Sequence, residues 1–580
     1  MELNYGIIDS GYRHTKYTRV FGDFYSKKEF STKVLKNETF AFQIILSSLE
    51  EFLCSLEDFN YISWNGLINR IRVSIDCDPA TTDSIEMSLV DYISDDTGAL
   101  VTDILSNKGS MNVEVGVAQF IWVKGKVPND FTGDFKFNIN LHYTKGYDDE
   151  VLIGSIPCNI DYANVTLPDL KDGDFFLDLW QHPCSLARQY NVKFWSDDHF
   201  NIIDNYIKEL ASLGQRTITI VASDFPWAGQ ACFNVADNPS NLFEHNIVSV
   251  IKDKNGEFKL NFDALNRFIE ICFKHGIDKE IDVFGLISNW DGKLFGNPLY
   301  PEYKDPFRIN YLDASDNCRK YMKSKDEIFI YIKLLMEHFK SMGWLEKLRI
   351  FCDEPNNPEL FNSSRDFIRS TMPEYEIKFK CAVNNTAFLE SDEYNITDSS
   401  VIIPIIGSEF HKFKKVSEDI ITKGDTITWF VCCFPQIPNQ FISSPPLESR
   451  LIGHITYMLS LSGFLRWNYC LYPSDVFNKP SYKFPRWIAG DMFFVYPGDD
   501  LKPMSSLRWE NLRLGIEQYN IMKMLEKSGT SSSDIISLIE EVTGTVADMK
   551  GTVYNFEMGY SLDENLYESV RIKLIEKLTK

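Results

Sequence analysis

The stretch FCDEPNNPEL, residues 351–360, places two carboxylates side by side behind an apolar run. Asp353 and Glu354 are followed directly by Pro355, which has no N–H to donate and therefore ends a strand ladder. A carboxyl group in a dry pocket has its pKa raised towards that of a useful general acid. The pair is therefore either an acidic surface turn or a catalytic pair at the end of a buried strand.

The charge balance of the chain excludes some partners. Its 580 residues include 82 acidic and 59 basic side chains, which gives a net charge of −23. Because such a surface repels a polyanion, nucleic acid is not an expected partner. The start, MELNYGIIDS, has neither a basic nor an apolar leader segment, and no stretch has the ~18 consecutive apolar residues of a membrane span. We therefore expect a cytoplasmic protein without a membrane partner.

The 12 cysteines are scattered along the chain and form no CxxC arrangement. Several, such as Cys158 and Cys272, lie inside apolar runs, which indicates buried free thiols rather than a disulfide framework or a zinc site. Cys432 and Cys433 are adjacent, but neighbours on one strand point to opposite faces, so they are not expected to share a ligand. No metal and no cofactor is predicted.

Residues 1–165 have the two-residue periodicity of strands. Runs such as NETFAFQIIL and DFKFNINLHY are separated by Asn, Asp and Gly, which predicts an N-terminal all-β sandwich domain. The stretch NVTLPDLKDGD, which is rich in turn residues and charges, ends this region as a linker.

Strand-like runs alternate with amphipathic helical segments over residues 166–500. The eight candidate strands are 175–182, 217–224, 281–288, 348–354, 377–384, 401–406, 426–433 and 463–470. This alternation predicts a (β/α)8 TIM-like barrel as the catalytic domain. The alternative is an open doubly wound sheet, but the first strand runs into QHPCSLARQY and not into the glycine-rich phosphate turn of that fold.

Residues 501–580 have helical patterns and are predicted to form a C-terminal helical segment that packs on the barrel. Arg508, Glu510 and Arg513 lie in its first helix, where we expect them to form a structural ion network.

In a (β/α)8 barrel the carboxyl ends of the strands surround one mouth, where the chemistry takes place. Asp353 and Glu354 end the fourth strand and are the predicted catalytic pair. The other strand ends carry aromatic and polar groups that suit a sugar, because its C–H faces stack on rings and its hydroxyls need donors and acceptors. The candidate substrate-binding residues are Trp180, His182, Asp224, Trp290, Asn384, Trp467 and Tyr469.

The adjacency of the two carboxylates constrains the mechanism. An ordinary retaining glycosidase needs an acid and a nucleophile about 5–5.5 Å apart across the scissile bond, usually from different strands. Consecutive residues diverge and are better suited to serve different parts of one sugar. In substrate-assisted hydrolysis the 2-acetamido oxygen attacks the anomeric carbon, one carboxylate stabilises the acetamido group, and the other protonates the leaving oxygen.

Three classes of function stay open at this point. The first is an exo-acting hexosaminidase that uses Asp353 and Glu354. The second is a glycosidase with a two-carboxylate mechanism on another sugar, in which Glu354 pairs with Asp224 or Asp178. The third is a catalytically silent carbohydrate-binding protein.

Several stretches together resemble glycoside hydrolase family 123 and the wider group of proteins that share its DUF4091 domain. They are FFLDLWQHP, the CDEP turn, GFLRWNYCLYP and GDMFFVYPG, and the resemblance extends over about residues 35 to 525. It implies a retaining β-N-acetylgalactosaminidase-like hydrolase that acts on a short glycan or glycoside through an oxazoline intermediate. On that pattern Asp353 stabilises the oxazolinium ion and Glu354 is the acid/base. Cys352 is a departure, because glycine commonly precedes the pair in that family.

Overall fold

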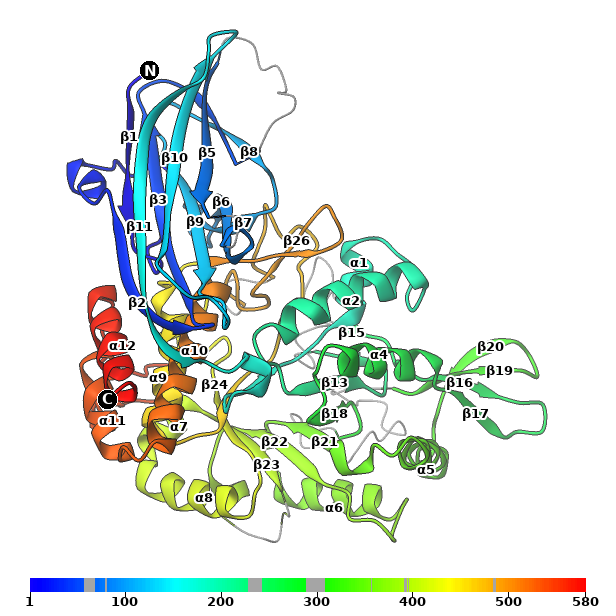
Figure 1. Ribbon diagram of the computed structural model, residues 1–580. Helices are drawn as coiled ribbons and strands as arrows, with labels where there is room; N and C mark the ends of the chain where they lie inside the picture. The colour runs from blue at the N-terminus through cyan, green and yellow to red at the C-terminus, as the bar shows by residue number, and fades with distance from the viewer. Residues whose placement is uncertain are drawn as a thin grey trace.

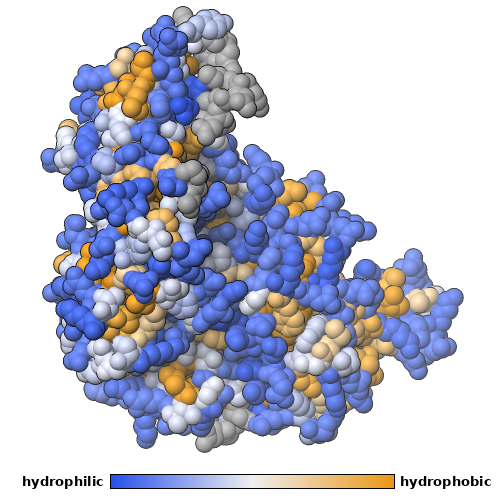
Figure 2. Space-filling view, in the orientation of Figure 1, coloured by the Kyte–Doolittle hydropathy of each residue, from blue (hydrophilic) through white to orange (hydrophobic). Residues whose placement is uncertain are grey.

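The computed structural model describes residues 1–56, 68–78, 81–227, 243–287, 308–355, 357–390, 394, 396–482 and 487–580. It confirms the predicted fold class: a sheet-rich N-terminal region, a nearly closed eight-stranded parallel barrel and a C-terminal helical segment (Figure 1). The face shown in Figure 2 is mainly hydrophilic, with hydrophobic residues in scattered patches. None of the helices in these described ranges has the length and apolar character needed to cross a membrane.

The N-terminal region packs two sheets face to face, with strand orders β1-β3-β9-β6-β7 and β2-β11-β10-β5-β4-β8. Along β10 alternate residues, from Phe135 to Leu141, are buried in the core between the sheets, which is the two-residue period seen in the sequence. The strands are β1 Leu3–Ile8, β2 Phe30–Lys36, β3 Thr39–Ser48, β4 Phe52–Ser55, β5 Asn69–Cys77, β6 Ile85–Ser94, β7 Leu100–Ser106, β8 Ser110–Val113, β9 Gln119–Lys126, β10 Phe135–Lys145 and β11 Val151–Thr166.

The barrel sheet has the order β12-β25-β24-β23-β22-β21-β18-β13, and the paired neighbours are parallel. Its strands are β12 Phe176–Leu179, β13 Thr217–Val221, β18 Glu280–Phe284, β21 Leu348–Asp353, β22 Phe379–Val383, β23 Asp398–Ile402, β24 Ile427–Phe430 and β25 Gly463–Arg466. The prediction of a strand over 401–406 was wrong in its bounds. β23 ends at Ile402 and helix α7 begins at Ile403, with Pro404 in its first turn, where proline is tolerated.

Helices surround the barrel and form the C-terminal segment (Figure 1). They are α1 Pro183–Gln189, α2 Asp197–Ala211, α4 Asp263–Lys274, α5 Lys325–Ser341, α6 Pro358–Arg369, α7 Ile403–Ser408, α8 Phe410–Thr422, α9 Leu447–Met458, α10 Leu507–Lys527, α11 Ser532–Thr543 and α12 Glu564–Leu578. Short strands decorate the barrel: β14 Phe225–Pro226, β15 Phe243–Glu244, β16 Ser249–Lys252, β17 Phe258–Asn261, β19 Asn310–Asp313, β20 Cys318–Tyr321, β26 Tyr496–Pro497 and β27 Pro503–Met504.

Side-chain amides close the barrel between β12 and β13, where only an isolated bridge joins the backbones. Gln215 accepts a hydrogen bond from the Leu179 N–H (2.9 Å) and donates to the Leu179 and Thr217 carbonyls. Gln181 accepts from the Thr219 N–H at 2.7 Å. All three partners are buried, so these bonds satisfy strand groups that a regular ladder would otherwise pair.

A buried ion cluster lies inside the barrel. The Lys380 ammonium on β22 is 2.7 Å from Asp178 on β12 and 3.0 Å from both Glu280 and Asp282 on β18. Burial alone lowers the pKa of Lys380, but the three carboxylates hold that pKa well above its usual value. Asp178, which was an alternative partner for Glu354, is thus an ion-pair partner of Lys380 inside the barrel. It also accepts a hydrogen bond from Thr217.

Charged side chains join helix α10 to the sandwich and confirm the predicted structural role of its ion network. Arg508 contacts Asp103 on β7 at 3.0 Å, and Glu510 contacts Lys124 on β9 at 3.3 Å. Arg513 donates to Glu510 within the helix at 3.0 Å. The network joins α10 to the sandwich, and its residues do not line the mouth of the barrel.

We expect Lys380→Met to lower the free energy of unfolding by about 3–5 kcal/mol, because it leaves buried carboxylates without their cation. Urea unfolding followed by fluorescence measures this change. Lys254→Met, at an exposed position, is the matched control and should change stability by less than about 0.5 kcal/mol. Equal stabilities for the two variants would contradict the role given to the cluster.

Candidate active site

A cavity of about 120 Å³ lies at the carboxyl ends of the barrel strands. Its walls come from the ends of five strands, β12, β21, β22, β24 and β25, and from segments that follow these strands or β13. The lining residues are Trp180, Trp227, Asp353, Glu354, Ala382, Phe430, Cys432, Cys433, Leu465, Trp467 and Trp487. The structure therefore brings both predicted catalytic carboxylates to one cavity.

Backbone geometry at Glu354 explains how two consecutive residues share this cavity. Asp353 is the last residue of β21, and Glu354 has φ 46°, in the left-handed region that non-glycine residues rarely adopt. The Glu354 N–H still donates to the Ala382 carbonyl of β22 at 2.8 Å, so the turn is anchored to the sheet. The turn interrupts the strand alternation that would send the two side chains to opposite faces.

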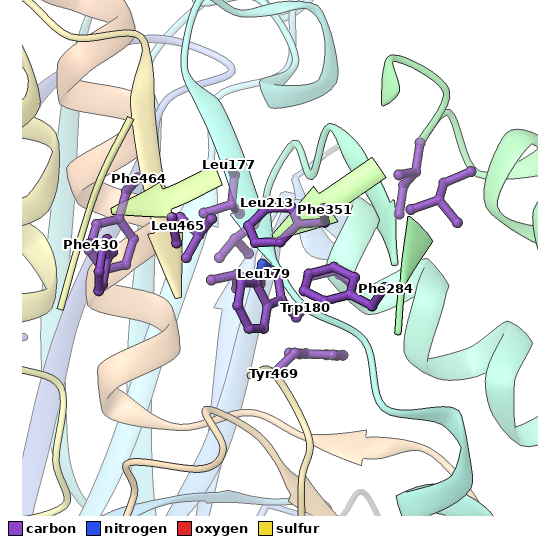
Figure 3. Packing of buried hydrophobic residues seen from close by; sticks show 14 of the residues in the cluster. Leu177, Leu179, Trp180, Leu213, Phe284, Phe351, Phe430, Phe464, Leu465 and Tyr469 are labelled. Carbon is purple, nitrogen blue, oxygen red and sulfur yellow. The ribbon is translucent and has the colours of Figure 1, made fainter. Parts of the chain in front are cut away.

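Aromatic rings form the floor of the cavity. The rings of Trp180 and Trp227 have centroids 5.4 Å apart, and Trp180 packs on Phe284 and Phe351 at 4.6 and 5.1 Å (Figure 3). The indole N–H groups of Trp180 and Trp227 are buried and have no hydrogen-bond partner among the described residues. The cavity is therefore lined here by ring surface, which suits the C–H face of a sugar.

A buried ion pair fixes another wall. The Trp467 indole N–H donates to Asp491 Oδ1 at 3.3 Å, and Arg466 donates to the same oxygen at 2.9 Å. Burial raises the pKa of Asp491 to about 6 in spite of the opposing effect of Arg466. Asp491 is fully buried behind Trp467 and does not line the cavity, so it positions the indole.

The electrostatics of the cavity favour an acid at Glu354. Burial raises the pKa of its carboxyl above the usual value for glutamate. A raised pKa favours the protonated form that can protonate a leaving group, which is the first requirement for cleaving an acetal. Among the described residues, no group of three or more His, Cys, Asp or Glu side chains could hold a metal ion.

The seven candidate substrate-binding residues do not all lie at the cavity. Trp180 and Trp467 line the cavity. His182 is buried behind the wall, with its ring 4.8 Å from that of Trp227, and burial lowers its pKa to about 3, so it stays neutral. Asn384 follows β22 and accepts a hydrogen bond from Asn385, but it is not a lining residue.

Two more candidates lie elsewhere. Asp224 accepts hydrogen bonds from the Asn246 N–H and the Asn310 amide and lines a separate groove of about 900 Å³. Tyr469 is a core residue, since its hydroxyl donates to the Tyr206 carbonyl at 3.2 Å and its ring packs on another aromatic residue. The prediction that placed it at the mouth assumed that its side chain points along the strand end. Trp290 lies outside the described residues.

Several lining residues were not among the predicted substrate-binding residues. Cys432 and Cys433 follow β24, Trp487 lies beyond β25, and Trp227 follows the short strand β14, in segments where side-chain direction has no fixed period. The signal available for Trp227 was its place three residues after Asp224, at the end of a predicted strand. Cys352, the departure from the family pattern, is buried in β21 and does not line the cavity.

A parallel barrel with two carboxylates and aromatic walls at the carboxyl ends of its strands is the arrangement of a glycoside hydrolase. The family model described as "Glycoside hydrolase 123, catalytic domain" matches residues 180–525, which is more than half of the chain. The chain therefore belongs to glycoside hydrolase family 123 and is a glycosidase.

A solved structure of a family 123 enzyme supports the fold. The structure of a family 123 glycoside hydrolase from Clostridium perfringens, studied for glycolipid glycan hydrolysis, has a TM-score of 0.75 and 18% identity, covering 100% of this chain and 98% of that one. An endo-β-1,4-mannanase from Thermotoga petrophila is similar over 61% of this chain and 78% of its own, at 12% identity and a TM-score of only 0.33. No curated protein matches the sequence.

The left-handed turn makes a prediction about stability. At Glu354 we expect the Gly variant to be more stable than the Ala variant by about 1 kcal/mol, because only glycine adopts φ 46° without strain. Both variants lose the carboxyl group, so their difference in free energy of unfolding, measured with urea, isolates the backbone.

Asp353 is the matched control position, since it lies in a strand. There Ala should be more stable than Gly by about 0.5–1 kcal/mol. The same order of stabilities at both positions would disprove the strained turn.

Proposed function

We propose that this glycosidase releases a terminal β-linked N-acetylhexosamine, with GalNAc as the first candidate, by substrate-assisted retaining hydrolysis through an oxazoline intermediate. One observation carries the proposal. Among the described residues that line the cavity, the carboxylates are Asp353 and Glu354, which are consecutive. Asp178 and Asp224, the two partners of the alternative mechanism, lie in the barrel interior and in a separate groove.

The reaction follows from these positions. Glu354, whose pKa burial raises, donates its proton to the leaving oxygen as the acetamido oxygen of the substrate attacks the anomeric carbon. Asp353 accepts a hydrogen bond from the acetamido N–H and stabilises the positive charge of the oxazolinium ion. Glu354 then removes a proton from the water molecule that opens the oxazoline, which restores the β configuration.

The walls of the cavity support a bound sugar ring. Ala382, Phe430 and Leu465 supply small and apolar surfaces that suit an acetamido methyl group. The rings of Trp180 and Trp227 supply flat surfaces on which the C–H face of the same sugar can stack.

Hydrolysis of 4-nitrophenyl glycosides tests the proposal. We expect turnover of the β-GalNAc or β-GlcNAc substrate and at least 100-fold slower turnover of β-galactoside and β-glucoside, because these have no acetamido nucleophile, consistent with effective molarities of at least about 10⁵ M for intramolecular attack. The better of the two acetamido substrates identifies the sugar. Equal turnover of the 2-hydroxy sugars would instead support the two-carboxylate mechanism.

Asp353→Asn is the control variant for this panel. The amide has nearly the same shape but lacks the negative charge that stabilises the oxazolinium, so kcat should fall by about 10²–10³-fold. Near wild-type kcat in this variant would remove Asp353 from the mechanism even if the substrate selectivity is as proposed.

The role of Glu354 predicts a dependence on leaving group and on pH. Glu354→Gln should lose about 10²–10⁴-fold in kcat with a poor leaving group such as methanol and much less with 2,4-dinitrophenol, which leaves without protonation. The pKa of Glu354 is raised, so wild-type activity should persist above the usual range of glutamate and fall as pH rises through that raised pKa. The variant should lack this alkaline decline, and equal losses with both leaving groups would contradict the assignment.

A further inference from the structure

Two thiols lie in the catalytic cavity. The Sγ atoms of Cys432 and Cys433 are 3.9 Å apart, and both residues line the cavity together with Glu354. The expectation that they point to opposite faces was wrong, because β24 ends at Phe430 and the chain turns before it reaches them. The Cys432 N–H donates to the Phe434 carbonyl at 3.0 Å, which fixes the turn.

The backbone is held from a second side. The side-chain amide of Asn439 donates to the Cys432 carbonyl at 2.9 Å, and its Oδ1 atom accepts from the buried Arg466 at 2.8 Å. The same arginine holds Asp491 behind Trp467. The segment that carries the two thiols is therefore part of the fixed wall of the cavity and not a free surface loop.

Adjacent cysteines are poorly placed for a direct disulfide. Consecutive Cα atoms are about 3.8 Å apart across a trans peptide, whereas disulfides usually join Cα atoms about 4.4–6.8 Å apart. Closing the 3.9 Å gap to a bond of about 2 Å would strain the turn. An atom that bridges the two sulfurs does not require this contraction.

The surroundings limit which atom can bridge them. Since the described residues contain no group of three or more side chains able to hold a metal ion, a tetrahedral zinc site with protein ligands is not supported. Two sulfurs without further ligands suit a soft, thiophilic centre that needs only this pair.

We propose that Cys432 and Cys433 form a dithiol site in the catalytic cavity for a soft, thiophilic electrophile that bridges both sulfurs, and that its occupation blocks the sugar site. The second part rests on the proposed function. Phenylarsine oxide is the probe: its arsenic stays trivalent, the two S–H bonds and the As=O bond break, two As–S bonds form, and the oxygen leaves as one water molecule.

The protonation of the thiols predicts selectivity. The hydrogen bond with Cys433 and burial both raise the pKa of Cys432 well above its usual value. Because alkylation requires a thiolate, iodoacetamide should modify Cys432 slowly at neutral pH. Chelation by two sulfurs does not depend on a standing thiolate population, so the arsenical should outpace the alkylating reagent.

Mass spectrometry of the folded protein treated with one equivalent of phenylarsine oxide tests the site. Trypsin should release residues 424–450 as one peptide, whose only cysteines are Cys432 and Cys433. We expect this peptide to carry one phenylarsenic group in place of two hydrogens, and to lose it on treatment with a dithiol but not with a monothiol. Arsenic absent from this peptide, or bound elsewhere, overturns the proposal, and this readout requires neither a variant nor enzyme activity.

Variants sharpen the result. Cys432→Ser and Cys433→Ser should each abolish the arsenical adduct, whereas Cys318→Ser, at an exposed position, should leave it intact. An adduct that persists with one sulfur removed contradicts a bridging site. On the substrate identified by the glycoside panel, occupation should abolish turnover in parallel with adduct formation, and turnover that survives full occupation overturns the block of the sugar site. A protein that takes up arsenic but hydrolyses no glycoside would refute the proposed function and leave the dithiol site standing.

Discussion

The left-handed turn at Glu354 is the constraint on which the arrangement of the site depends. Two consecutive strand residues point to opposite faces, so a regular β21 would direct one carboxylate towards the cavity and the other towards the opposite face of the sheet. The turn costs about 1–2 kcal/mol for a non-glycine residue. The hydrogen bond from Glu354 to Ala382 and the burial of Pro355 hold the chain in this conformation. These contacts with the sheet offset the conformational cost of the turn.

The barrel beneath this turn is organised in layers of different chemistry. The Lys380 cluster joins β12, β18 and β22 within the barrel. The rings of Trp180, Phe284 and Phe351 pack together beneath the cavity (Figure 3). Because the closure between β12 and β13 relies on glutamine side chains and not on a full ladder, cross-strand contacts through the interior add to the coherence of the sheet.

The periodicity of the sequence predicted the regular strands, but not the direction of side chains beyond the strand ends. The sandwich strands follow from a two-residue apolar period, the barrel strands follow from apolar runs between helical segments, and the positions of Asp353 and Glu354 follow from the end of a strand. Side-chain direction beyond a strand end does not follow, which is why Tyr469 was placed at the mouth and the thiols of Cys432 and Cys433 were expected to diverge. The interior position of Asp178 was also beyond reach, because its partner Lys380 is 202 residues away in the chain.

The difference between the regular core and the connecting segments also explains how a fold persists at low sequence identity. The structure from Clostridium perfringens shares 18% identity with this chain and still aligns at a TM-score of 0.75. Cores tolerate extensive apolar substitution when volume and pattern are kept. The walls of the cavity are under a second constraint, because Trp227 and the two cysteines lie in connecting segments and are also held by the rest of the fold. Trp227 lines the cavity and packs on the rings of His182 and Phe284. Selectivity for a sugar, and sensitivity to a thiophilic reagent, therefore depend on residues that serve both the core and the site.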